Sequence, residues 1–200
     1  MNHSGLSESS VRDALGELVR SPQVGLTQFL DRYQQMAFSG VEESLLFEQA
    51  TANVMENVFG LDATHVGQRG RVRDIEVSSD NWVGIIDTKA YAAYDLPSDH
   101  QSRMQTSYVP KYLSGDSELA FFMYVAGGFA PSINGKLSKV IDATGIPGSG
   151  IGIVPWTQLI NGHEDSGLDR EDLRDLWSIG REITTQDVAE LLSKNRNEDA

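Results

Sequence analysis

Residues 83–89 read Val-Gly-Ile-Ile-Asp-Thr-Lys, and they determine both the predicted fold class and the candidate chemistry. They form an apolar run of strand length that ends in an acid, one spacer and a lysine. Because side chains alternate along a strand, we predict that Asp87 and Lys89 share one face while Thr88 points away. Residues 72–78 form a second run rich in Val and Ile, and the polar turn Ser-Ser-Asp-Asn separates the two runs. The pattern predicts a β-hairpin.

The segments on either side of the hairpin alternate between helical and strand patterns. Pro22 separates two helices predicted in the opening segment to about residue 39, and Gly60 is predicted to cap the next helix. That helix and the later ones are predicted over residues 41–59, 99–113, 136–143, 169–178 and 185–192. Buried strands are predicted at residues 119–125 and 151–154. We therefore predict an α/β domain with a central mixed β-sheet flanked by helices over residues 41–200, preceded by an N-terminal helical extension over residues 1–40.

Composition excludes several classes of protein. The chain has 200 residues, of which 40% are hydrophobic and 22% are charged, as in a globular domain with a sizeable core. It has no cysteine, which excludes disulfides, thiol catalysis and cysteine-ligated zinc, and which fits a reducing compartment. No apolar run is long enough to span a bilayer, and residues 1–10 are too polar for a signal peptide. We expect a cytoplasmic protein with no membrane partner.

The net charge of −13 opposes unaided binding to nucleic acid, which normally uses many Lys and Arg contacts. Within this acidic chain, Arg69, Arg71 and Arg73 form a local basic strip just before Asp74. The strip has two interpretations. Its side chains either contact phosphates of a DNA backbone or are solvated charges in a loop.

Two carboxylates and an ammonium group are predicted to converge at one edge of the hairpin. Asp74 lies on the arm opposite Asp87, where cross-strand pairing brings the two acids together beside Lys89. Such acids repel one another unless a divalent cation neutralises them, and Mg²⁺ suits oxygen ligands. Glu48 is a further candidate, because in helical spacing it shares a face with Leu45, Ala52 and Met55. The alternative is a surface ion pair with no catalytic role.

The remaining polar and aromatic residues give weaker patterns. His3, His65, His100 and His163 lack metal-binding spacing, and none is predicted to be a general base. Gly145, Gly148, Gly150 and Gly152 precede a strand, with no P-loop lysine after them, so we interpret them as a flexible loop. Packing is favoured over substrate contact for Tyr91 and Tyr94, and Trp156 and Trp177 are predicted core residues.

The stretch Ile86-Asp87-Thr88-Lys89-Ala90-Tyr91, followed by Tyr94-Asp95-Leu96-Pro97, resembles the cleavage domain of FokI-type type IIS restriction endonucleases. These enzymes belong to the PD-(D/E)xK superfamily of Mg²⁺-dependent nucleases. The likeness runs from about Leu45 to Glu198. It also covers Phe47-Glu48, Phe59-Gly60, His65-Val66-Gly67, the stretch from Phe122 to Phe129 and the helix after Thr184-Thr185.

This resemblance implies a restriction-endonuclease-like fold and roles for individual residues. Asp74 and Asp87 would bind the metal, Lys89 would be the catalytic lysine, and Glu48 would be the acid of the first core helix. The expected cofactor is Mg²⁺, for which Mn²⁺ would substitute. Arg73 stands where the family usually has proline, and Ser102 and Thr106 stand where FokI has an Asp/Arg pair in its dimerisation helix. The FokI homodimer interface is therefore not carried over.

The first functional hypothesis is a metal-dependent endonuclease that hydrolyses DNA phosphodiester bonds. It would be the cleavage module or subunit of a restriction-type system, because the chain contains no recognisable DNA-reading motif. A separate recognition domain or subunit would target it, and double-strand cleavage would need a second nuclease copy or partner site. Two alternatives remain open. One is a non-catalytic interaction subunit that retains the fold, and the other is a stand-alone defence or repair nuclease acting on RNA or branched DNA.

Overall fold

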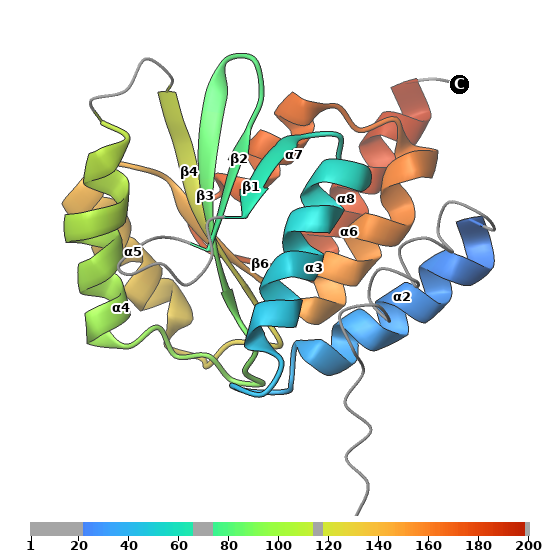
Figure 1. The fold of residues 1–200 in the computed structure, drawn as a ribbon. Coiled ribbons are helices and arrows are strands. Elements are labelled where there is room, and N and C mark those ends of the chain that lie inside the picture. The colour runs from blue at the N-terminus through green and yellow to red at the C-terminus, as the bar shows by residue number, and fades with distance from the viewer. Residues whose placement is uncertain (1–21, 66–73, 114–117, 199–200) are drawn as a thin grey trace, which may run out of the picture.

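The computed structural model describes residues 22–65, 74–113 and 118–198, and in these ranges it forms a sheet covered by helices on both faces. Helices α4 and α5 cover one face, and α2, α3, α6, α7 and α8 lie on the other side (Figure 1). No helix in the described ranges is both long and apolar enough to cross a membrane. The predicted first helix falls within residues 1–21, which lie outside the described residues.

The sheet has six strands in the order β1-β2-β3-β4-β5-β6. The first three strands pair antiparallel, and β3 to β6 pair parallel, so the predicted central mixed sheet is confirmed. The predicted hairpin is also confirmed, with Ile75 of β2 opposite Ile86 of β3. The strands are β1 Asp62–His65, β2 Ile75–Ser78, β3 Trp82–Lys89, β4 Glu118–Ala126, β5 Gly148–Gly152 and β6 Glu182–Ile183.

The helices follow most of the predicted ranges. They are α2 Pro22–Met36, α3 Ser44–Asn57, α4 Ser98–Arg103, α5 Ile133–Thr144, α6 Ile153–Ser166, α7 Arg170–Trp177 and α8 Thr185–Glu198. A π-helix over Met104–Tyr108 and a 3₁₀ turn over Val109–Lys111 continue α4. Gly60 adopts a φ of +63° after α3, as a capping glycine does. Thr184 and Asp187 cap α8 reciprocally, with the Thr184 amide donating to Asp187 Oδ2 at 2.8 Å.

Three details of the sequence prediction were wrong. Strand β1 was missed because its four residues, Asp-Ala-Thr-His, contain no apolar run. The glycines at 148, 150 and 152 are buried in strand β5 and do not form the predicted flexible loop. Glycine suits positions 148 and 150 because the rings of Phe122 and Phe129 occupy the space where side chains would lie. Strand β5 ends at Gly152, so the predicted strand over residues 151–154 is wrong for its second half, where α6 begins at Ile153. Pro155 is tolerated because it lies in the first turn of this helix.

The larger core joins α2, α3, α6 and α7 to one face of the sheet. Trp156 and Trp177 are fully buried in it, as predicted. The Trp156 indole donates to the Tyr33 hydroxyl at 3.0 Å, and that hydroxyl lies 2.6 Å from Thr51 Oγ1. These bonds satisfy the polar atoms of a buried contact between α2, α3 and α6. The smaller core lies between the opposite face and α4 and α5. The division of the chain at residue 40 stays a prediction.

Candidate active site

Asp74 and Asp87 meet where β2 and β3 begin to separate. The ladder between these strands ends at Ile75 and Ile86, so Asp74 comes next to Asp87 in the same register. Beyond the ladder, Asp74 Oδ2 accepts a 2.7 Å hydrogen bond from the Thr88 amide and a 3.2 Å bond from the Thr88 hydroxyl. Side chains alternate along this part of β3 as predicted, since Ile86 and Ala90 belong to one core and Ile85 to the other, but the contact of Thr88 with Asp74 was not predicted. The Asp74 carboxylate comes close to Thr88 because it accepts from the strand amide that the ladder leaves free.

Lys89 places its ammonium group against both acids. Its Nζ atom donates to Asp87 Oδ1 at 2.7 Å and to the Thr88 carbonyl at 2.9 Å, and it lies 3.8 Å from Asp74 Oδ2. The side chain is only 15% exposed. A two-residue spacing on one strand accounts for the Asp87–Lys89 contact. Among the predicted site residues, the structure thus brings Asp74, Asp87 and Lys89 together in one cluster.

The cluster holds one more negative charge than its lysine can neutralise. Burial and the charge of Asp87 raise the pKa of Asp74 to about 8. Burial acts upward on Asp87 too, but the charge of Lys89 and a hydrogen bond with Asp74 hold the pKa of Asp87 below its usual value. Burial favours a neutral Lys89, yet the two acids raise its pKa, so it stays an ammonium. Without a further cation, Asp74 keeps a proton near neutral pH.

The donor set fits a hard divalent cation. Two buried carboxylates in contact, one of them protonated for want of positive charge, provide oxygen ligands at a place where a cation can replace the proton. Across the described ranges, no three His, Asp or Glu side chains form a complete cage for an ion. Mg²⁺ does not need one, because it typically keeps several waters and uses one or two carboxylates together with substrate phosphate. Asp74 and Asp87 are therefore the residues that fit such an ion.

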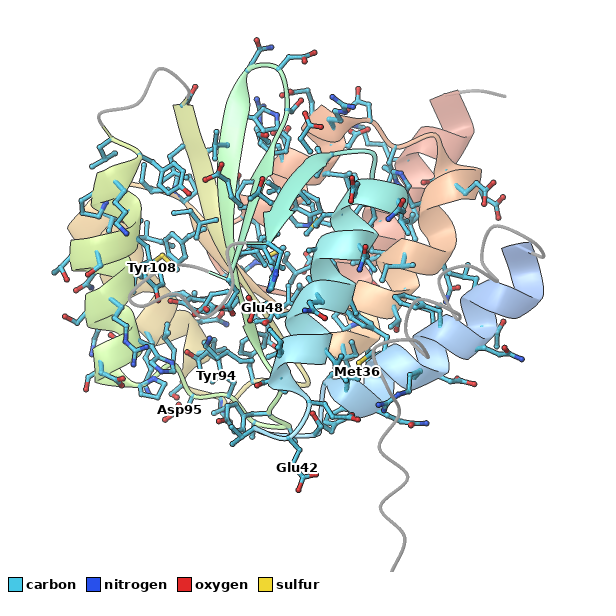
Figure 2. The ribbon with its side chains drawn as sticks, in the orientation of Figure 1. Met36, Glu42, Glu48, Tyr94, Asp95 and Tyr108 are labelled. Carbon is cyan, nitrogen blue, oxygen red and sulfur yellow. The ribbon has the colours of Figure 1, made fainter. Side chains whose placement is uncertain are left out.

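Glu48 lies on α3 (Figure 2), near enough to the cluster for the charges of Lys89 and Asp87 to act on it, and it is paired with His65 at the end of β1. Glu48 is 5% exposed, and its Oε1 atom is 2.6 Å from His65 Nε2. Both atoms are buried, and neither has another hydrogen-bond partner in the described residues. Burial raises the pKa of Glu48, whereas the charges of His65 and Lys89 lower it.

The predicted surroundings of Glu48 were partly right. Ala52 and Met55 are buried with it, but Leu45 is 41% exposed because it belongs to the first turn of α3. His65 was missed as a site residue, since a lone histidine has no metal-binding spacing. The only indication was the His-Val-Gly stretch in the family resemblance.

The predicted DNA-backbone residues Arg69, Arg71 and Arg73 lie outside the described residues, so their contact with DNA stays a prediction. The segment that carries them joins His65 to Asp74 along the chain. Tyr94 is buried against Tyr124 and Phe129, as the packing interpretation predicted, whereas Tyr91 is 48% exposed. Tyr94 also has a polar contact that was not predicted, because its hydroxyl lies 2.6 Å from His100 Nδ1.

The fold is that of the restriction endonucleases. The solved structure of restriction endonuclease FokI matches with a TM-score of 0.67 and 20% identity, over 90% of this chain and 35% of the FokI chain. FokI bound to DNA matches with a TM-score of 0.68 and 18% identity, over 90% of this chain and 34% of that chain. The small subunit of the heterodimeric restriction endonuclease R.BspD6I matches with a TM-score of 0.56 and 13% identity, over 86% of this chain and 98% of that one.

The sequence comparison identifies the family more specifically. The family described as "FokI, cleavage domain" matches residues 5–184, which is most of the chain. The chain therefore belongs to the FokI cleavage-domain family, and the resemblance predicted from the sequence is confirmed. It spans about a third of the length of the FokI chains that it matches. No curated protein matches it.

Proposed function

We propose that this chain is a metal-dependent endonuclease that hydrolyses DNA phosphodiester bonds as the cleavage module or subunit of a restriction-type system. The observation that carries the proposal is the contact of Asp74, Asp87 and Lys89 in a chain of the FokI cleavage-domain family. A surface ion pair would not need a second buried acid that remains protonated beside the first.

Each residue of the cluster has a chemical role in this proposal. Asp74 and Asp87 would hold Mg²⁺ or Mn²⁺, and the ion would supply an activated water and stabilise charge on the phosphate. Lys89 is fixed by Asp87 and the Thr88 carbonyl, so its charge is held beside the metal position before substrate arrives. It would orient the attacking water or bind the same phosphate, and this preorganisation favours the transition state.

A separate recognition part is the second element of the proposal. It is supported by the match to about a third of each FokI chain and by the net charge of −13. A weakly binding cleavage module cuts only where a targeting domain or subunit delivers it. One such site cuts one strand, so a double-strand break would need a second copy or a partner site. The likeness to the small subunit of a heterodimeric restriction endonuclease is compatible with a partner subunit.

Cleavage of supercoiled plasmid tests the proposal. The wild-type chain, the Asp87→Ala variant and the surface control Asp31→Ala would be incubated at high concentration with Mg²⁺, Mn²⁺ or EDTA. We expect metal-dependent nicking by the wild type and the control, and none by Asp87→Ala. Absence of nicking together with absence of Asp87-dependent Mn²⁺ binding would reject a nuclease and favour the scaffold alternative.

A further inference from the structure

The segment that leaves β3 after Lys89 returns to the site and carries a second histidine. Tyr94 is buried in this segment, and its hydroxyl is 2.6 Å from Nδ1 of His100 in the first turn of α4. Their rings lie 5.9 Å apart. The His100 side chain is 24% exposed, so the imidazole is partly open to solvent while its Nδ1 atom is held by Tyr94.

Backbone contacts hold this segment in one conformation. The Tyr94 amide donates to the Gly128 carbonyl at 2.9 Å, and the Tyr94 carbonyl accepts from Ala130 at 3.0 Å. Leu96 is fully buried with a φ of +42°, which is unfavourable for a branched side chain. Gln101 donates to its carbonyl at 2.9 Å. A strained residue of this kind persists only where its surroundings fix it, and such residues gather at functional sites.

Two residues at the start of helix α5 bind the same segment from the solvent side. Lys136 Nζ lies 2.7 Å from the Asp95 carboxylate and donates to the Asp95 carbonyl, and the Ser132 hydroxyl binds the same side chain. Asp95 therefore occupies the outer edge of the segment, while Tyr94 points into the molecule (Figure 2). Contacts with the loop after β4, with α4 and with the start of α5 thus hold the segment that carries Tyr94.

The Tyr94–His100 pair lies next to the acid–lysine cluster, which consists of Asp74, Asp87 and Lys89. Tyr124 is opposite Asp87 in the β3–β4 register, and its ring is 5.8 Å from that of Tyr94. The Tyr124 hydroxyl is buried without a hydrogen-bond partner in the described residues. The charges of Lys89 and Asp87 both reach His100.

The protonation of the pair defines which atom of His100 is free to bind. Burial and Lys89 lower the pKa of His100, so the ring is neutral at neutral pH. Burial raises the pKa of Tyr94, which keeps its hydroxyl protonated and able to donate to an Nδ1 atom that carries no proton. In that tautomer the proton of His100 is on Nε2. That atom lies 3.7 Å from Asp99, beyond hydrogen-bond distance, and Asp99 is engaged by Arg103 at 2.6 Å.

We infer that His100 is a further substrate-binding residue, whose Nε2–H donates to a DNA phosphate oxygen beside Lys89, and that Tyr94 is its positioning residue. The inference rests on the proposed function, because the ligand is the phosphate of the DNA that the cluster would cleave. A neutral donor suits this acidic chain, since it binds phosphate without a cationic side chain that nearby acids would sequester.

Duplex binding and nicking by matched variants test the inference. Fluorescence anisotropy with a 20-base-pair duplex in Ca²⁺ would give Kd, and plasmid nicking in Mg²⁺ would give kcat and KM. We expect His100→Ala to weaken binding about tenfold and to raise KM more than it lowers kcat, as removal of an interaction present before the transition state does. His100→Gln retains a donor and should stay within about threefold of wild type, and Tyr94→Phe should fall between the two. His163→Gln is the matched control outside the site.

Each outcome has a defined meaning. Unchanged Kd and KM in His100→Ala would overturn the inference, provided that Asp87→Ala still abolishes nicking and so leaves the proposed function intact. Equal losses in His100→Ala and His100→Gln would overturn it as well, because they would show a packing role instead of a donor role. A wild-type chain that binds no duplex at high concentration would overturn this inference, and one that also neither nicks plasmid nor binds Mn²⁺ through Asp87 would overturn the proposed function with it. Thermal unfolding of each variant separates these results from loss of fold.

Discussion

The acid–lysine cluster and the two histidine pairs beside it are held by different forces. Asp74, Asp87 and Lys89 lie within one hairpin, where the ladder of β2 and β3 fixes their spacing. The Glu48–His65 pair instead joins α3 to β1, and the Tyr94–His100 pair joins the segment after β3 to α4. The cluster is a product of local backbone geometry, whereas the pairs depend on how helices pack on the sheet.

Substitutions in the two regions should therefore separate chemistry from stability. Replacing Asp87 or Lys89 leaves the backbone hydrogen bonds of the strands in place, so the fold should persist while activity is lost. Replacing a member of the Glu48–His65 pair removes a contact between packed elements and leaves the other member buried without a partner. Activity and stability should then change together.

The strongest effect we expect is that of Lys89→Ala on cleavage. Removing the cation that contacts Asp87 should lower the nicking rate by at least about 10²-fold, in the range typical for loss of one charge-stabilising group. Binding of Mn²⁺, measured by calorimetry, should persist because both acids remain. The matched control is Lys139→Ala, which removes an exposed lysine on α5. Wild-type nicking by Lys89→Ala would show that the lysine is a structural counter-ion only.

The second effect concerns stabilisation by metal. Because an ion that binds only the folded state at 100 times its Kd stabilises by about 2.7 kcal/mol, Mn²⁺ should raise the Tm of the wild type by about 5–10 °C. Asp74→Asn removes one of two adjacent buried carboxylates, so the metal-free variant should unfold no earlier than the wild type. Its Tm should no longer respond to Mn²⁺. Differential scanning fluorimetry with and without EDTA measures both, and an Mn²⁺ response equal to that of the wild type would remove Asp74 from the proposed ligands.

The difference between contacts set within one hairpin and contacts set by helix packing explains which parts of the site the sequence could predict. The contact of Asp87 with Lys89 follows from strand alternation, and the meeting of Asp74 with Asp87 follows from a hairpin whose turn is readable in the sequence. The partner of Glu48 was not predictable, because His65 ends a polar edge strand that has no apolar pattern. The strand at Gly148–Gly152 was misread because glycines normally indicate a loop, and only the rings of Phe122 and Phe129 explain them.

The third effect tests the coupling of Glu48 to His65. His65→Ala leaves a buried carboxylate without its partner, which should lower the free energy of unfolding by about 1–3 kcal/mol and also slow nicking. Glu48→Gln with His65→Ala should restore part of the stability, since the orphaned charge is gone. Urea unfolding of the two single variants and the double variant measures this coupling. Strictly additive losses would mean that the two side chains do not act as a pair.

The weakest effect concerns the basic strip of Arg69, Arg71 and Arg73, which lies between His65 and Asp74 in the sequence. If Arg69 and Arg71 bind phosphates, the double variant Arg69→Ala/Arg71→Ala should nick plasmid a few-fold more slowly at low salt. For this variant, the slope of log K for DNA binding against log salt concentration should be shallower by about 0.9 for each phosphate that is no longer neutralised, and thus by about 1.8 for two. Lys89→Ala should not be rescued by lowering the salt, because its defect lies in a step after binding. A salt titration of both variants therefore distinguishes a defect in binding from a defect in chemistry. Parallel salt dependences for the wild type and the arginine double variant would show that Arg69 and Arg71 are solvated charges that bind no phosphate.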